Sequence, residues 1–182
     1  MYLITTRSFP PELGGVQSLM WGLARELSKN LMIKVFADYQ ENHKEFDKEA
    51  NFSIERVGGI KFLRKIRKAQ LINEFIKENK VEGIIADHWK SLELIKSDKK
   101  MYCLIHGKEI NHPLGSSLNK RVIKVLNNVE KVIANSEYTK NLVPVRDGES
   151  DLFKAMKQIA INGNGPDQQI PSAGCSIKWK NN

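Results

Sequence analysis

The sequence predicts an α/β fold, a Rossmann-like parallel sheet with helices on both faces. Short apolar runs, typical of buried parallel strands, alternate along the chain with segments whose apolar residues recur at helical spacing. Loops that carry glycine or polar residues follow several of these strands directly. The alternation stops near residue 143. We therefore expect one domain over residues 1–143 and a divergent, partly disordered tail over residues 144–182.

The first half supplies three predicted strands and one helix. Residues 2–6 form an apolar strand, and residues 32–37 form a second one. A polar loop over 38–51 separates the second strand from a short strand over 52–57. The helix between the first two strands has one apolar face, made of Val16, Leu19, Met20, Leu23, Ala24 and Leu27.

The second half repeats the pattern. Strands are predicted over 81–87, 101–106 and 131–135, and helices over 61–80, 116–129 and 136–143. Ser136 is the expected N-cap of the last helix. The core face of the helix over 61–80 is expected to carry Phe62, Ile66, Ala69, Ile72 and Ile76.

Composition limits the class of protein. The chain has 182 residues, of which 41% are apolar, and no apolar run reaches the roughly 20 residues that span a bilayer. Cys103 and Cys175 form neither a disulfide framework nor a metal-binding spacing, and no signal-peptide pattern opens the chain. We therefore expect a cytoplasmic protein. Its net charge of +8 favours anionic partners without choosing among them.

The loop "FPPELGG", residues 9–15, is the first candidate site. Gly14 and Gly15 lack a Cβ and stand at the start of a helix, where free N–H groups and the helix dipole favour a phosphate. The alternative is a tight turn that needs glycine for its own geometry. The chain has neither G-x-G-x-x-G nor a Walker lysine, so a standard dinucleotide or P-loop site is not supported.

A histidine follows the predicted strand over 101–106. In this fold His106 would point into the ligand crevice, although a histidine hydrogen-bonded to backbone is the alternative. Lys108, Glu109 and His88 are further candidates beside this crevice. His43 and His112 are expected on the surface, and no metal-ligand spacing is present.

The segment 61–80 is a basic amphipathic helix. Such a helix can lie on an acidic membrane, and it can equally be a covering helix with a solvated outer face. Its aromatic residues do not form a stacking platform, so we expect no nucleic-acid partner. The cations expected to face a membrane are Lys61, Arg64, Lys65, Arg67 and Lys68.

Taken in order, several motifs resemble the N-terminal domain of a family 4 glycosyltransferase of the two-domain GT-B type. They are "FPPELGGVQ", "LARELSK", "KVFA", "IIADHW", "LIHGKEI" and "VIANSEYTKNLV". The resemblance covers about residues 1–143 and implies transfer of a sugar from a nucleotide-diphosphate-sugar donor to a saccharide or lipid acceptor. No metal or other cofactor is expected. The resemblance further implies that Gly14 and Gly15 face the donor diphosphate and that His106 lies beside the transferred sugar as the catalytic residue.

The resemblance also implies a second, donor-binding domain. Its paired glutamates are absent from this sequence, in which Glu149 is the only glutamate after residue 143. We therefore expect this chain alone to be inactive, with a separate chain as one source of the donor domain. The alternatives are a non-catalytic remnant that binds an acceptor or a membrane surface, and a different Rossmann-type protein such as a dehydrogenase.

Overall fold

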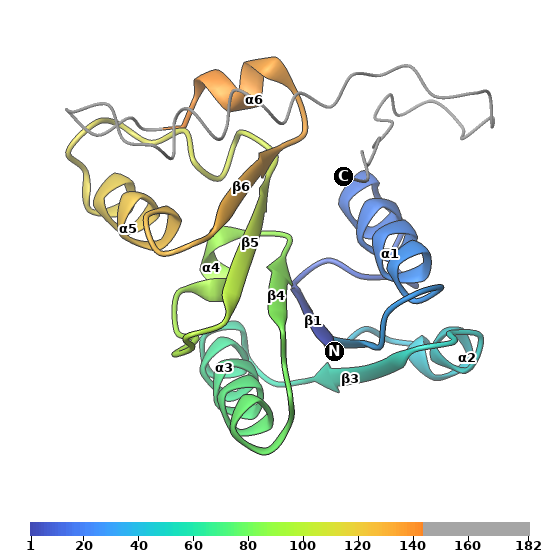
Figure 1. The fold of residues 1–182 in the computed structure, drawn as a ribbon. Coiled ribbons are helices and arrows are strands. Elements are labelled where there is room, and N and C mark those ends of the chain that lie inside the picture. Colours follow the sequence, from blue (N-terminus) through green and yellow to red (C-terminus); the bar gives the residue numbers. More distant parts are fainter. Residues whose placement is uncertain (144–182) are drawn as a thin grey trace.

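The computed structural model describes residues 1–143, and these form one six-stranded parallel sheet with the order β3-β2-β1-β4-β5-β6 (Figure 1). The strands are β1 (Tyr2–Thr6), β2 (Ile33–Asp38), β3 (Ser53–Val57), β4 (Gly83–Ala86), β5 (Lys100–Ile105) and β6 (Lys131–Ala134). The sheet runs outward from β1 in both directions, so the strand order reverses between β1 and β4. In open sheets of this kind, ligands bind at that reversal, beyond the carboxyl ends of the strands.

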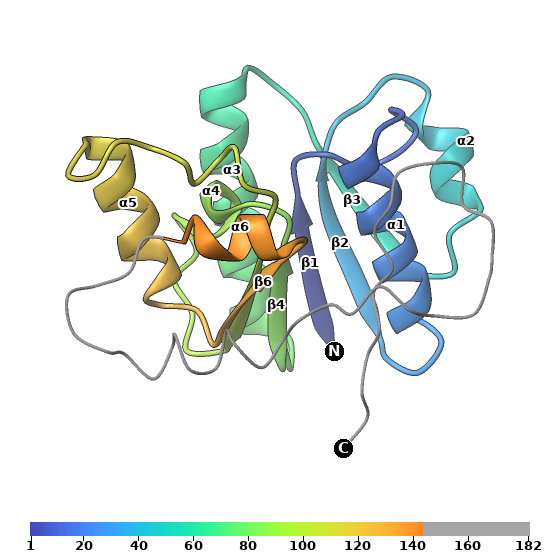
Figure 2. The ribbon, with the colours of Figure 1, turned by 90° about the horizontal axis from the view of Figure 1, so that it is seen from above.

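Helices cover both faces of the sheet, as the sequence predicts (Figure 2). One face packs against α3 (Lys61–Glu78), α4 (Trp89–Leu92) and α5 (Ser117–Leu126). The other packs against α1 (Gly15–Leu27), and α2 (His43–Lys48) adds Phe46 to that layer. The last helix, α6 (Glu137–Asn141), follows β6. No helix within residues 1–143 is long and apolar enough to cross a bilayer.

The sequence predicted α1 well. Met20, Leu23 and Ala24 are buried on its inner face, as the spacing of its apolar residues indicates. Ser136 caps α6, since its Oγ accepts a hydrogen bond from the N–H of Thr139 at 3.1 Å.

Two short helices were not predicted. The helix α2 lies inside the expected polar loop over 38–51, and it is too short and polar to show a periodic apolar face. It is anchored by tertiary contacts instead. The ring of Phe46 lies 4.5 Å from that of Trp21, and Asp47 pairs with Arg56 at 2.6 Å. The helix α4 begins directly after β4, where a loop was expected.

The helix α3 corrects part of the expected core face. Ala69 and Ile72 are buried as predicted, but Phe62 is 71% exposed, so its placement in the core was wrong. Phe62 lies in the first turn of α3, at the edge of the layer, where the facing helix α4 is only four residues long.

Cys103 lies in the middle of β5 and is fully buried in the larger core cluster. Burial raises the pKa of its thiol far above the ordinary value, so it is an unreactive core residue in the folded chain. The expectations about the tail over 144–182 and about Cys175 concern residues outside the described part of the chain.

Candidate functional site at the carboxyl edge of the sheet

Asp87 organises the carboxyl edge of the sheet at the point where the strand order reverses. It directly follows β4, and its carboxylate is buried. Oδ2 accepts hydrogen bonds from Thr6 Oγ1 at 2.8 Å and from the N–H groups of Arg7 and Ser8 at 2.9 and 3.3 Å. Oδ1 accepts a bond from Ser91 Oγ at 3.2 Å. One side chain therefore ties the end of β1 to the start of α4. Sequence analysis did not single it out, although it stands in the quoted motif "IIADHW".

His106 follows β5, as predicted, and joins this assembly. Its Nε2 lies 3.1 Å from the carbonyl oxygen of Asp87, and because a carbonyl can only accept, this nitrogen must carry the proton. Among residues 1–143, Nδ1 has no hydrogen-bond partner. His106 is thus hydrogen-bonded to the backbone, as the alternative interpretation of the sequence expects. Its second ring nitrogen stays available to a ligand. Gly107 makes the turn after it with φ +110°, a left-handed conformation that favours glycine.

Glu109 has a structural role in the same loop. Its carboxylate accepts a hydrogen bond from the backbone N–H of His106 at 2.5 Å, and its carbonyl oxygen accepts one from Trp89 Nε1 at 2.8 Å. These bonds fix the loop after β5 against α4. Lys108, the other charged candidate in this loop, is exposed.

His88 is the N-cap of α4. Its Nδ1 accepts a hydrogen bond from the N–H of Lys90 at 3.0 Å, which requires an unprotonated nitrogen. Burial, followed by the positive charges of Arg7 and Lys90, lowers the pKa of His88 to about 3. His88 is therefore neutral at physiological pH and acts as a hydrogen-bond acceptor within this edge.

The glycine pair lies at the beginning of α1. Gly14 is the N-cap, with extended backbone and no side-chain hydrogen bond to cap the helix, and Gly15 is the first helical residue. A Cβ on Gly15 would meet no atom within 4 Å, and one on Gly14 would meet only the flexible end of Gln17. Packing therefore does not demand glycine at position 15. The phosphate hypothesis for this pair stays a prediction.

Arg56 braces the same loop. Its guanidinium donates a hydrogen bond to the carbonyl oxygen of Pro10 at 2.5 Å and lies 5.3 Å from the ring centroid of Phe9. Asp47 of α2 accepts two further bonds from Arg56, at 3.1 and 2.6 Å. The loop after β1 is thus held at its proline end, whereas Leu13 at its tip is 95% exposed.

The basic helix α3 does not present all its cations to the outside. Lys68 is only 4% exposed, and its Nζ donates to Asp38 Oδ1 and to the carbonyl oxygen of Thr6, both at 2.6 Å. Its assignment to a membrane-facing surface was wrong, because its position on α3 points it at the carboxyl ends of β1 and β2. Arg64 pairs with Asp38 at 3.0 Å and Lys65 pairs with Glu93, while Lys61 and Arg67 are exposed.

The remaining histidines differ from the expectation of plain surface residues. His43 opens α2, is largely buried, and has Nδ1 3.0 Å from a carboxylate oxygen of Asp47. His112 has a buried Nε2 with no hydrogen-bond partner among the described residues. Within residues 1–143 no three His, Cys, Asp or Glu side chains are grouped so that they could hold a metal ion.

The topology defines a Rossmann-like α/β domain, which bears out the predicted fold class. No protein-family model and no curated protein matches the sequence. Solved structures do match the fold. Anabaena HepE in complex with UDP superposes with a TM-score of 0.60 and 17% identity, over 83% of this chain and 42% of HepE.

Two further solved structures show how much the fold alone can say. The lipopolysaccharide outer core galactosyltransferase WaaB matches with a TM-score of 0.53 and 11% identity, over 79% of this chain and 42% of WaaB. The UDP-GlcNAc 2-epimerase of Methanocaldococcus jannaschii matches with a TM-score of 0.52 and 14% identity, over 79% of this chain and 42% of the epimerase. The chain thus spans about two fifths of the length of these proteins. Because a transferase and an epimerase share the fold, the fold does not define the reaction.

Proposed function

We propose that this chain is the acceptor-side domain of a glycosyltransferase that uses a nucleotide-diphosphate sugar. The observation that carries the proposal is the placement of three sequence motifs on one edge of a β3-β2-β1-β4-β5-β6 sheet. The glycine loop follows β1, the Asp87–His88 pair follows β4, and His106 follows β5. The HepE structures with UDP, and with UDP and glucose, support a nucleotide sugar as the donor, and WaaB supports transfer as the reaction.

In this proposal the residues have separate roles. The N–H groups at Gly14 and Gly15 would receive the donor diphosphate at the positive end of α1. His106 would lie beside the transferred sugar as the catalytic residue. With Nε2–H held by the Asp87 carbonyl, its Nδ1 would accept a hydrogen bond from a sugar hydroxyl. The acceptor would be bordered by His88, which is neutral, and by Lys108 and Glu109. No metal enters this scheme, since donor phosphates can be neutralised by N–H groups and basic side chains.

A donor-binding second domain, on the same or a separate chain, is part of the proposal. Transfer needs both walls of a cleft to position the reacting atoms. We therefore expect the 182-residue chain alone to give no sugar transfer from a panel of nucleotide sugars to membrane lipid or polysaccharide acceptors. Robust turnover by the purified chain would contradict this division of labour.

Donor binding can be tested on the chain as it is. Isotope-labelled protein is titrated with UDP-glucose, UDP-galactose and UDP-GlcNAc, and backbone amide shifts are followed by NMR. We expect shifts centred on Gly14, Gly15 and His106, and weaker ones for NAD, which needs a glycine fingerprint that this chain lacks. Equal shifts with NAD, or shifts elsewhere only, would speak against the proposal.

Envelope polysaccharide or lipid acceptors, and a peripheral position on the inner face of a membrane, belong to the same proposal. The support is an exposed apolar group at the start of α3, made of Ile60, Phe62 and Leu63 and flanked by the exposed cations Lys61 and Arg67. Apolar side chains beside cations fit an acidic bilayer surface, where each cation contributes about 1 kcal/mol. A non-catalytic chain that only binds such a surface is the second candidate function.

Vesicle binding tests this surface. Vesicles with acidic lipids should bind the chain and neutral vesicles should not, and salt should weaken the binding. Replacing Phe62 and Leu63 by serine should reduce binding without loss of the fold, because both side chains are already exposed. The matched control replaces the exposed Leu114, far along the chain in the loop before α5. Equal binding to both kinds of vesicle would contradict the membrane surface.

A further inference from the structure

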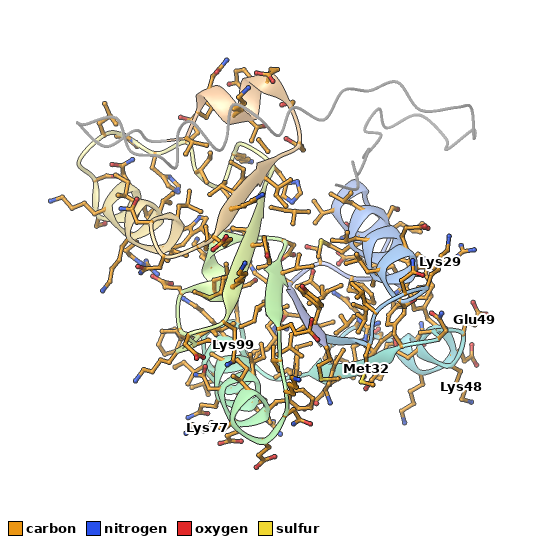
Figure 3. The ribbon with its side chains drawn as sticks, in the orientation of Figure 1. Lys29, Met32, Lys48, Glu49, Lys77 and Lys99 are labelled. Carbon is orange, nitrogen blue, oxygen red and sulfur yellow. The ribbon has the colours of Figure 1, made fainter. Side chains whose placement is uncertain are left out.

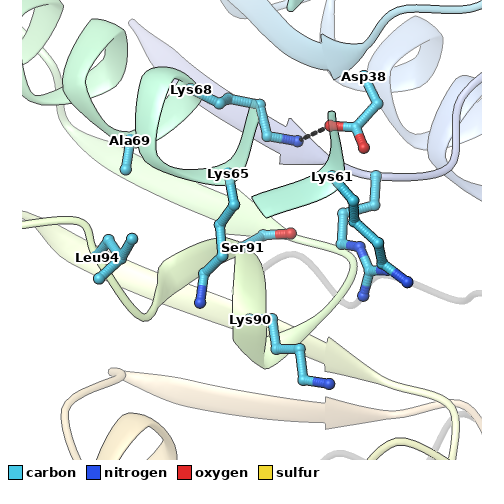
Figure 4. Close-up of a pocket in the computed structure, with 9 residues that line it drawn as sticks. Asp38, Lys61, Lys65, Lys68, Ala69, Lys90, Ser91 and Leu94 are labelled. Carbon is cyan, nitrogen blue, oxygen red and sulfur yellow. Dashed lines mark hydrogen bonds and ion pairs between the residues drawn. The ribbon is translucent and has the colours of Figure 1, made fainter. Parts of the chain in front are cut away.

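A small pocket lies between α3 and α4, at the carboxyl ends of β1 and β2 (Figure 4). Its water-accessible volume is about 90 Å³. Sites for whole ligands usually measure roughly 300–1,000 Å³, so this pocket has room for one group of a larger molecule. The side chains that line it are Arg7, Asp38, Lys61, Lys65, Lys68, Ala69, Lys90, Ser91 and Leu94.

The carboxylates around the pocket are already engaged. Asp38 pairs with Lys68 and with Arg64, at 2.6 and 3.0 Å. The carboxylate of Glu93 pairs with Lys65 and is held by Arg121 through two bonds of 2.6 and 2.8 Å. These bonds, rather than burial, lower the pKa of Glu93 to about 2.

The carboxylate of Asp87 is likewise engaged, because its four hydrogen bonds come from hydroxyl and backbone N–H groups. No ion pair within residues 1–143 involves Arg7, Lys61 or Lys90, although all three line the same pocket. Three cations thus converge from the loop after β1, from α3 and from α4 without an ion-pair partner in the described part of the chain.

Burial and the positive charge around the pocket lower the pKa values of neighbouring side chains. Burial lowers the pKa of Lys90, and the charges of Arg7, Arg121, Lys61 and Lys65 lower it further. Besides burial, two of these cations, Arg7 and Lys65, also lower the pKa of His88 next to it. Cations that repel one another cost stability unless an anion joins them, and such arrangements are typical of binding sites for anionic ligands.

We propose that this pocket between α3 and α4 binds a phosphoryl group, held by Arg7, Lys61 and Lys90. The guanidinium of Arg7 can give two parallel N–H donors to two phosphoryl oxygens, and the two ammonium groups approach from the facing helices. The pocket lies on the α3–α4 side of the sheet, whereas Gly14 and Gly15 open α1 on the other side (Figure 2). It is therefore a second anion site, separate from the one proposed for the donor.

The pocket's ligand follows from this position. If the chain is the acceptor-side domain proposed above, the phosphoryl group belongs to the acceptor. Leu94 lines the pocket and is partly exposed, and the apolar group Ile60, Phe62 and Leu63 adjoins Lys61. The source of the phosphate is then either a water-soluble phosphate or the head of a lipid. Phosphate chemistry is common to both, and only this identification depends on the proposed function.

Calorimetric titration of the 182-residue chain tests the site. The probes are inorganic pyrophosphate, a soluble short-chain prenyl phosphate and the matching prenol. We expect saturable binding of both phosphates and none of the prenol. A tighter constant for the prenyl phosphate would identify a lipid source, and a tighter one for pyrophosphate a soluble source. Absence of saturable binding of either phosphate would overturn the proposal.

Charge-matched variants separate the pocket from the general positive charge of the chain. We expect Arg7→Gln with Lys90→Gln to weaken pyrophosphate binding at least about tenfold, since two charge-assisted hydrogen bonds to the phosphoryl group are lost. Lys29→Gln with Lys77→Gln removes the same charge far from the pocket and should leave the affinity within about twofold. Equal weakening by both pairs would overturn the proposal, because binding would then be diffuse.

Two further measurements keep the test decisive. Lys61→Gln changes an exposed side chain, so it reports on the site even if the double variant folds poorly. Amide shifts with pyrophosphate should include Arg7, Lys61 and Lys90, whether or not Gly14 and Gly15 also respond. Shifts confined to Gly14 and Gly15 would overturn the second site and leave the proposed donor site standing, so the two proposals fail separately.

Discussion

The cations at the two edges of the sheet differ in whether they have ion-pair partners. At the amino edge, lysines pair with nearby carboxylates: Lys34 with Glu55 at 2.8 Å, Lys29 with Glu26 at 2.6 Å and Lys99 with Asp98 at 3.3 Å. Figure 3 shows labelled lysines such as Lys29, Lys48 and Lys77 on the periphery, where water solvates them. At the carboxyl edge, Arg7, Lys61 and Lys90 converge on one pocket without such partners in residues 1–143.

The difference indicates which charges serve the fold and which are available for binding. Exposed ion pairs contribute little stability, so the pairs of Lys29 and Lys99 can be removed at small cost. The carboxyl edge combines buried, fully bonded groups that hold the strands with cations that have no ion-pair partner among residues 1–143. Each experiment below compares one residue of the carboxyl edge with a matched residue elsewhere.

The largest effect is expected for Asp87→Ala. The substitution removes four hydrogen bonds and leaves the backbone N–H of Arg7 without its acceptor, while Thr6 and Ser8 still bond to each other, and we expect a loss of about 3 kcal/mol in the free energy of unfolding. Asp98→Ala at the amino edge, where the side chain is 82% exposed, should change it by less than about 0.5 kcal/mol. Urea unfolding followed by circular dichroism measures both. Similar losses for the two would remove the distinction between the edges.

Lys68→Met should come next. It removes a buried ammonium group that binds both Asp38 and the carbonyl oxygen of Thr6. Because Arg64 still pairs with Asp38, we expect a loss of about 2 kcal/mol, less than the roughly 3–5 kcal/mol typical when a buried charge loses its only partner. Lys77→Met at the other end of the same helix is the control and should be neutral. A neutral result for both would mean that the buried pair adds nothing to stability.

His88 should make stability depend on pH. Its pKa falls from the ordinary 6.5 to about 3 on folding, so between these values the unfolded chain binds more protons than the folded one. Stability should be complete well above pH 6.5 and fall as the pH drops toward 3, by about 2.5 kcal/mol between pH 7 and pH 4.5.

The matched variant is His88→Asn, which keeps a side-chain oxygen for the N–H of Lys90 but does not titrate. The protein with His88 should lose stability relative to the His88→Asn variant as the pH falls. A constant difference across this range would show that His88 is not the titrating group.

The smallest effect concerns the turn after β5. Gly107→Ala forces a side chain into a left-handed conformation and brings its Cβ to 3.1 Å from Thr139 Oγ1, and we expect a loss of about 1–2 kcal/mol. Gly22→Ala, on the exposed side of α1 with no atom within 4 Å, should instead stabilise the chain by about 0.5–1 kcal/mol. Thermal unfolding resolves the opposite signs, and a loss in both variants would contradict this account.

The sequence predicts the strands and long helices well because their apolar residues report burial directly. Each of the six predicted strands is present, and α1 buries the face that its spacing indicates. The sequence does not predict the helices α2 and α4, because segments of four to six residues are too short to show a helical period. Their positions depend on contacts distant in sequence, such as those of Phe46 with Trp21 and of Trp89 with Glu109.

The candidate site was predictable only in part. The position of His106 after a strand indicates the correct edge of the sheet, because parallel strands end together. The pairing of Lys68 with Asp38 joins residues 30 positions apart, and a sequence pattern cannot rank one lysine of a basic helix above the next. The pocket likewise depends on Arg7 and Lys90, which join α3 only in the folded chain.

The thiol of Cys103 can be used to measure local opening of the sheet. Its thiol is fully buried in β5 between β4 and β6, so an alkylating reagent reaches it only when the centre of the sheet opens. In a Cys175→Ser background, the rate of its alkylation measures how often that happens. Because β5 leads directly to His106, a ligand that binds at the carboxyl edge should slow the labelling in proportion to the occupancy of its site.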